Sequence, residues 1–189
     1  MKRFAGAIFT GALVVGGLVG MSAPAFAVTT FTQCSSVNGH ATLSPGISNT
    51  HQSSHVTGTA TIGGCVGGNV TGGSLSFQGD TIPGDCNSLA NPTPGQVVIT
   101  GTFSINWTGP SPGTSTGSLK AKQTNNPIQV KAITKITGGK FAGTGSNPTK
   151  GKVLVQFTPD PGQNCTTTPI TGVGVQNVAG NKFVVASAH

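Results

Sequence analysis

Residues 97–107 read VVITGTFSINW, and their alternation decides the fold class. From Ile99 onward the odd positions carry Ile, Gly, Phe, Ile and Trp, whereas the even positions carry Thr, Thr, Ser and Asn. A period of two is typical of a β-strand with one buried and one solvated face. This stretch therefore predicts a strand that points Trp107 into a core.

The same alternation recurs on both sides of this strand. Residues 128–137 place Ile128, Val130, Ala132 and Ile136 on one face, and residues 152–157 alternate as well. Weaker strands are expected near 28–33, 38–44, 54–62, 74–78, 116–123, 172–178 and 182–187. About ten short antiparallel strands predict an all-β fold, either an Ig-like or Greek-key β-sandwich or a partly closed β-barrel.

The composition supports this class and excludes others. The 189 residues include 30 Gly and 12 Pro, no Glu and three Asp, and 7% of them are charged. Few helix formers argue against a helical bundle, and the low charge argues against a charge-extended disordered chain. The residues 79–96 and 108–117 are rich in Gly, Pro, Ser and Asn and are predicted to be long surface loops.

The first 27 residues have the pattern of a secretory signal peptide. Lys2 and Arg3 precede an apolar run, and Ala25 and Ala27 form an A-x-A cleavage site. We therefore expect residues 28–189 to form one exported domain without a membrane span, either free outside the cell or associated with the cell wall. Loss of Lys2 and Arg3 lowers the formal net charge from +7 to +5.

Four cysteines lie in the exported part, at positions 34, 65, 86 and 165. An even number in an oxidising compartment predicts two disulfides, and no C-x-x-C pair suggests zinc. Residues 31–43 and 54–65 flank a turn near Asn49, and a hairpin there would place Cys34 nearly opposite Cys65. This favours Cys34–Cys65 with Cys86–Cys165, and a local Cys65–Cys86 bridge is the alternative.

The sequence offers little for catalysis. Gly113–Gly117 matches the G-x-S-x-G motif around Ser115, with Asp160 and His189 following in the order of α/β-hydrolases. A nucleophile elbow needs a strand before it and a helix after it, whereas prolines precede this motif and a strand-like stretch follows. Asp80 and Asp85 have the local sequences of turns. We therefore expect no catalytic residue.

Metal and cofactor sites are equally poorly supported. His40, His51 and His55 are the metal candidates, but on a strand His51 and His55 would stand about 13 Å apart. We therefore interpret them as surface histidines and expect neither a metal nor a cofactor.

The lysines are the remaining candidates for binding. Three pairs each share one face of a strand: Lys120 with Lys122, Lys131 with Lys135, and Lys150 with Lys152. They indicate either a solvated face that protects sheet edges or contact with an anionic surface. We expect a non-enzymatic protein that contacts an anionic envelope polymer or another secreted protein, and no nucleic acid. An extracellular hydrolase and a self-assembling surface or pore protein are the alternatives.

Several short motifs carry a resemblance. They are the signal ending APAFA, C-x-x-x-x-G at 34–39, SPG at 44–46, GTATIGGC at 58–65, GTFSINW at 101–107 and GGKFAG at 138–143. In these the chain resembles a group of small Gly/Thr-rich secreted proteins of high-GC Gram-positive bacteria, the actinobacteria. The resemblance covers most of the exported part. It implies export and an all-β architecture, and it assigns no catalytic or binding residue.

Overall fold

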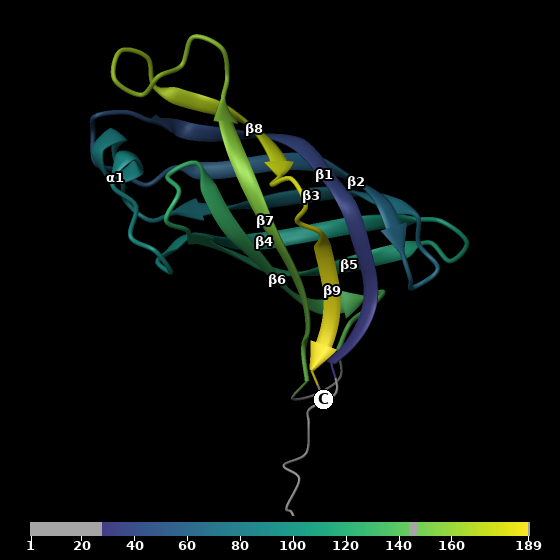
Figure 1. The fold of residues 1–189 in the computed structure, drawn as a ribbon. Coiled ribbons are helices and arrows are strands. Elements are labelled where there is room, and N and C mark those ends of the chain that lie inside the picture. The colour runs from purple at the N-terminus through teal and green to yellow at the C-terminus, as the bar shows by residue number, and fades with distance from the viewer. Residues whose placement is uncertain (1–27, 144–146, 189) are drawn as a thin grey trace, which may run out of the picture.

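The computed structural model describes residues 28–143 and 147–188. The expected signal peptide, with Ala25 and Ala27, lies outside the described residues. The described part is almost wholly β (Figure 1). Its elements are β1 (Val28–Ile47), β2 (His55–Val66), β3 (Gly72–Thr81), α1 (Cys86–Ala90), β4 (Val97–Thr108), β5 (Gly113–Gln123), β6 (Gln129–Gly139), β7 (Thr149–Pro159), β8 (Ile170–Asn177) and β9 (Phe183–Ala188).

The strands close into an antiparallel barrel. Each strand from β1 to β7 pairs with the next along the chain, and β8 returns to pair with β1. The last strand, β9, stands outside this ring of eight and pairs with the first half of β1 and with β7. The predicted sandwich is therefore wrong, and the barrel alternative is confirmed, with full rather than partial closure.

The length of β1 explains the closure. It spans 20 residues, pairs with β2 along one edge, and pairs with β9 and then β8 along the other. The sequence suggested two separate strands here, at 28–33 and 38–44. Because one continuous strand uses both edges over its length, no free edge remains for a second sheet.

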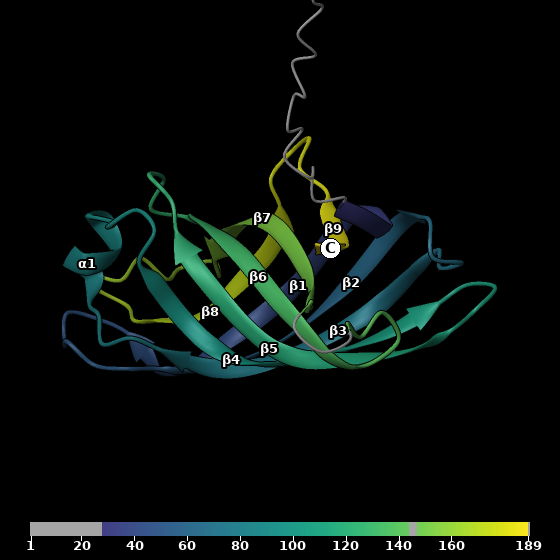
Figure 2. The same ribbon diagram turned by 90° about the horizontal axis from the view of Figure 1, so that it is seen from below.

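The hydrophobic core lies inside the barrel, and Figure 2 shows how the strands curve around this interior. Inward positions alternate with solvated ones along each strand, and Ile62, Ile105, Ile136 and Val185 are almost fully buried. Trp107 is 2% exposed, as its position in the alternation predicts. Gly58 also faces inward, where an added Cβ would lie 2.4 Å from Cζ of Phe77. The glycine therefore leaves room for that ring.

The predicted β1–β2 hairpin is confirmed. Cys34 is directly opposite Cys65 in the ladder, and a disulfide joins them, with their Cα atoms 3.8 Å apart. A second disulfide joins Cys86 of α1 to Cys165 in the β7–β8 connection. This is the pairing that the sequence favours. It connects α1 to a segment 79 residues further along the chain.

Two predicted loops are shorter than expected. The segment 108–117 is not a long loop, because β5 begins at Gly113 and pairs with β4 up to Trp107. Within 79–96 the chain forms the five-residue helix α1. Its start is stabilised by Asp85, whose carboxylate accepts a hydrogen bond from the backbone N–H of Ser88. In the described part of the chain, no helix has the length and hydropathy to cross a membrane.

Candidate functional site

The six lysines singled out from the sequence lie together on the outer surface of three neighbouring strands. On β5, β6 and β7 the inward positions include Ala121, Val130 and Val153, which are buried. The lysines occupy the positions between them, so the alternation turns every one of them outward. We call this surface the lysine face; it comprises Lys120, Lys122, Lys131, Lys135, Lys150 and Lys152.

The strand register brings lysines of different strands into direct opposition. Lys122 of β5 faces Lys131 of β6, and Lys135 of β6 faces Lys150 of β7. Ile133 lies between Lys120 on one side and Lys152 on the other. Opposed side chains start only about 5 Å apart at Cβ, and like charges placed so destabilise a sheet. The three predicted pairs therefore merge into one concentrated cationic surface.

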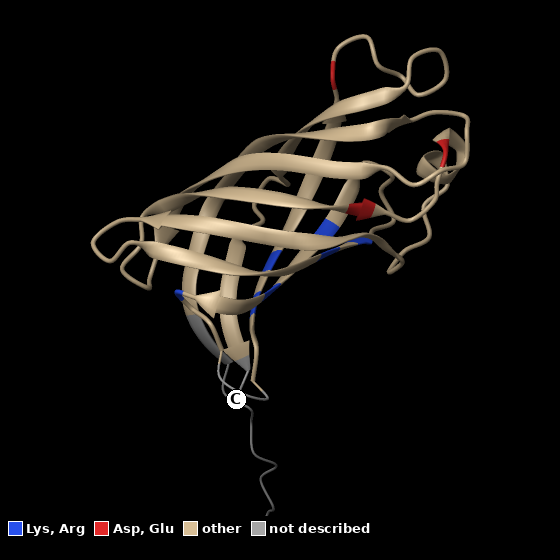
Figure 3. Cartoon of the chain, turned by 180° about the vertical axis from the view of Figure 1, so that it is seen from behind, with Lys and Arg blue, Asp and Glu red and all other residues tan. Residues whose placement is uncertain are grey.

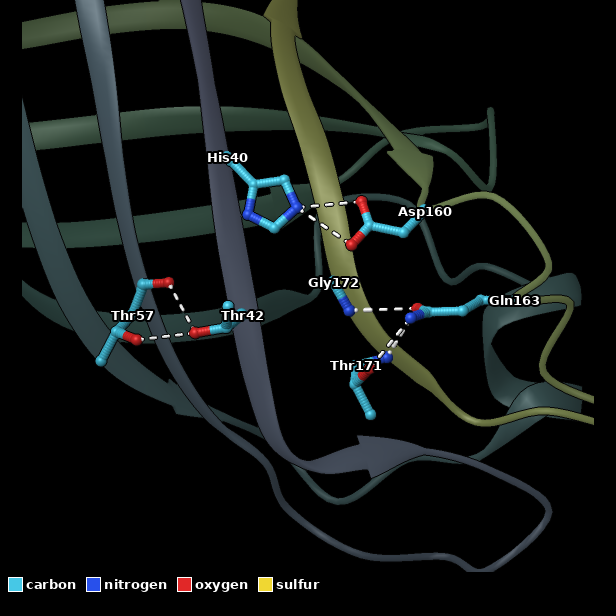
Figure 4. Close-up of polar contacts among 7 residues, drawn as sticks. All are labelled: His40, Thr42, Thr57, Asp160, Gln163, Thr171 and Gly172. Carbon is cyan, nitrogen blue, oxygen red and sulfur yellow. Dashed lines mark hydrogen bonds and ion pairs between the residues drawn. The ribbon is translucent and has the colours of Figure 1, made fainter.

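Each of the three aspartates lies beside a histidine rather than a lysine. His40 Nε2 lies 2.9 Å from Asp160 Oδ1 (Figure 4), and His55 Nδ1 lies 2.9 Å from Asp80 Oδ1. Figure 3 shows the acidic positions toward the barrel end that carries α1 and the β7–β8 connection. Asp80 of β3 is aligned through Thr100 of β4 with Lys120 of β5, two strands away. Within residues 28–143 and 147–188, no lysine forms an ion pair. The lysine face therefore has no internal counter-charge.

Asp85 has a structural task. The backbone N–H and the hydroxyl of Ser88 each donate to Asp85 Oδ1 at 2.8 Å, and His51 Nδ1 lies 3.4 Å from Asp85 Oδ2. These hydrogen bonds, that of the Ser88 backbone first, lower the pKa of the Asp85 carboxyl below its ordinary value of 3.8. The carboxylate thus caps α1.

The hydrolase motif does not form a site. Ser115 is fully buried in β5, where its hydroxyl accepts a hydrogen bond from Trp107 Nε1 at 2.9 Å and donates to the carbonyl of Lys140. Asp160 is bound to His40 rather than to Ser115. His189 lies outside the described residues. Ser115 therefore holds the indole of Trp107 in place and is not exposed as a nucleophile.

The histidines are likewise dispersed. Each of His40, His51 and His55 is exposed and lies beside a different aspartate. Among the residues that the structure places, no three His, Cys, Asp or Glu side chains come together in a way that could hold a metal ion. Asp80 and Asp85 engage different histidines.

The sequence identified the three lysine pairs but did not predict that they form one surface. For the first of the two lysine oppositions, a signal was present in the turn at Asn126–Pro127 between β5 and β6. Counting outward from this turn pairs Lys122 with Lys131. The opposition of Lys135 and Lys150 follows only from the observed pairing of β6 with β7.

Comparisons with protein-family models, with curated proteins and with solved structures found no match to this chain. The resemblance to secreted actinobacterial proteins therefore stays a prediction.

Proposed function

We propose that this is a secreted, non-enzymatic protein that binds an anionic, phosphate-rich polymer of the cell envelope through the lysine face. The observation that carries the proposal is the pair of direct lysine oppositions, Lys122 with Lys131 and Lys135 with Lys150, on a surface without carboxylates of its own. Such an arrangement costs folding stability. A polyanion that supplies the missing counter-charge would offset that cost.

The spacing of the lysines suits a polymer with repeated charges. Neighbouring strands lie about 4.8 Å apart, and alternate residues along a strand about 6.7 Å apart. The lysine ammonium groups are flexible point charges that bind phosphate oxygens without demanding one fixed geometry. The lysine face can therefore follow a flexible chain of phosphates rather than one particular small anion.

The location outside the cell rests on two supports. The described chain contains two disulfides, and such bonds persist in oxidising compartments. The first 27 residues have the pattern of an export signal. An envelope polymer is then a partner that the protein would meet in that compartment.

The test is binding of the exported part, residues 28–189, to long-chain polyphosphate and to purified cell walls. Binding is measured in about 10 mM and about 150 mM NaCl, where the Debye length is about 30 Å and about 8 Å. We expect binding at low salt that weakens steeply at the higher salt. The double variant Lys135→Gln/Lys150→Gln should lose about tenfold in affinity, because each lost phosphate contact removes part of a purely electrostatic attraction.

Lys140→Gln is the control. Lys140 lies outside the lysine face, where its ammonium group donates to Ser111 Oγ and stands over the ring of Phe141. We expect this variant to bind within about twofold of the unchanged protein. Equal losses from Lys140→Gln and from the double variant, or no binding in the low-salt buffer, would overturn the proposal.

A further inference from the structure

The two ends of the barrel interior differ. At the end with the Cys34–Cys65 disulfide, large aromatic rings fill the space. Trp107 stacks on Phe183 with ring centroids 6.3 Å apart and meets Phe141 edge-on at 5.4 Å. The opposite end lies under α1. An eight-stranded barrel is just wide enough for side chains to fill it or for one small ligand.

A cavity of about 190 Å³ occupies that second end. Its walls are mostly apolar and come from both sides of the barrel and from α1; they include Leu43, Val56, Phe77, Leu89, Val98 and Val173. For comparison, an engineered apolar cavity of about 150 Å³ binds benzene. The space therefore suits a compact apolar group somewhat larger than a benzene ring.

The helix α1, which covers this cavity, is held in place by a disulfide and by nearby hydrogen bonds. The Cys86–Cys165 disulfide ties α1 to the β7–β8 connection, and Gln52 and Gly84 exchange two backbone hydrogen bonds beside it. Leu89 of α1 packs against the core cluster. The cavity is thus bounded by a fixed helix, and such preorganisation reduces the entropy lost on binding.

Two side chains at the rim add a second observation. Ile82 is 36% exposed and Ile128 is 40% exposed, and both line the cavity. Within the described ranges, three large hydrophobic side chains are exposed to this degree, and Val66 is the third. The apolar lining therefore continues outward to the surface, as an entrance for an apolar molecule would require.

The lining also restricts the charge of a ligand. Of the described residues around the cavity, Asp85 alone carries a charged side chain, and no lysine, arginine or histidine is present. A carboxylate ligand would find no cation to pair with and would approach Asp85, which disfavours it. The side-chain amides of Gln52, Gln96 and Gln123 can donate a hydrogen bond to a neutral head group or accept one from it.

We infer that the α1 end of the barrel is a binding site for a small, uncharged, largely apolar molecule with a single polar head, such as an aliphatic alcohol. This inference is independent of the lysine face, since the two surfaces share no residue. The apolar part would lie between Phe77, Val98 and Val173. The head group would lie at the mouth, near the glutamine amides.

The experiment compares octan-1-ol with octanoate, which have the same chain length and differ in charge. Each is titrated into the ¹⁵N-labelled exported part, and the backbone amide shifts give both the affinity and the location. We expect octan-1-ol to shift amides of α1 and of the β4 segment around Val98, and octanoate to bind at least about tenfold more weakly. Amides of Lys135 and Lys150, which are not adjacent to any lining residue, should stay unmoved.

Val98→Trp and Val97→Trp form a matched pair of variants. Val98 lines the cavity and its neighbour Val97 does not, so the same added ring fills the space only in the first. We expect Val98→Trp to weaken octan-1-ol binding at least about tenfold and Val97→Trp to leave it within about twofold. Equal effects of the two variants, or shifts away from the α1 end, would overturn the inference.

Ile128→Lys is a second variant, chosen because the exposure of Ile128 makes a polar replacement there compatible with folding. It places a cation at the mouth. We expect octanoate to gain affinity relative to octan-1-ol, by at least about threefold. An unchanged ratio of the two affinities would contradict the site, whether or not Val98→Trp folds.

Discussion

Lys135 of β6 and Lys150 of β7 are directly opposed on the outside of the barrel. Their neighbours on the same face repeat the arrangement in Lys122 and Lys131. Opposed positions on a sheet are where cross-strand pairs contribute most to its stability, and opposite charges would do so favourably. The chain instead places like charges there twice, which is why we connect this surface with binding rather than with folding.

The first prediction concerns the folding cost of that opposition. Replacing Lys135 by Glu creates an opposite-charge pair with Lys150. We expect the free energy of unfolding to rise by about 0.2–1 kcal/mol in low salt. Urea denaturation in about 10 mM NaCl measures this, and the gain should shrink when salt screens the charges. Lys140→Glu, which has no opposed lysine, should give no gain; a rise of the same size there would contradict the explanation.

The second prediction concerns the Cys86–Cys165 disulfide. Replacing both cysteines by Ala opens a loop that spans 79 residues in sequence and frees α1. We expect the free energy of unfolding to fall by about 4 kcal/mol, because the unfolded chain gains conformational entropy. Denaturant unfolding measures the loss. Octan-1-ol binding should weaken in the same variant under folding conditions, whereas unchanged binding would show that the helix does not depend on this bond.

The third prediction concerns pH. Hydrogen bonds from Ser88 lower the pKa of Asp85, so the ionised carboxylate stabilises α1. This contribution is fully present above the ordinary pKa of 3.8 and is lost as the pH falls through the lowered pKa of Asp85. Following the Asp85 carboxyl carbon by NMR from about pH 6 to about pH 2 should show a midpoint below 3.8.

Ser88→Ala tests the cause of that shift. It removes the hydroxyl donor and leaves the backbone N–H, so the pKa of Asp85 should rise toward its ordinary value without reaching it. Ser76→Ala, on the outer face of β3, is the control and should leave the Asp85 titration unchanged. A midpoint that does not move in Ser88→Ala would refute the assignment.

The fourth prediction concerns Ser115. Ser115→Ala leaves the buried Trp107 Nε1–H without its acceptor, and we expect a loss of about 1–3 kcal/mol in the free energy of unfolding. Thr116→Ala, the next residue along β5, faces outward and should cost less than about 0.5 kcal/mol. Thermal or urea unfolding of both variants checks this. Similar losses in the two would mean that the Trp107–Ser115 hydrogen bond contributes little.

Local pattern was enough to predict the strands and one disulfide register. The alternation at 97–107 places Trp107 in the core, and the turn near Asn49 places Cys34 opposite Cys65, as the structure has them. Both depend on interactions within one strand or one hairpin, where spacing along the chain converts directly into spacing in the sheet. Export of the chain stays a prediction, since its signal lies outside the described residues.

The choice between a sandwich and a barrel could not be predicted from the local sequence pattern. Alternation reports that a strand has one buried face, and both architectures supply one. Closure depends on β1 continuing past residue 33 and pairing with β8 and β9, which follow more than 120 residues later in sequence. No local spacing encodes a pairing over that distance.

The amino-acid sequence by itself determined the all-β class, the positions of most strands, the inward and outward faces, and the presence of six outward lysines. The tertiary structure decided that the lysines form one face and that the barrel is filled at one end and hollow at the other. The physical reason is that faces follow from a period of two within a strand, whereas surfaces and cavities arise from the register and stagger between strands.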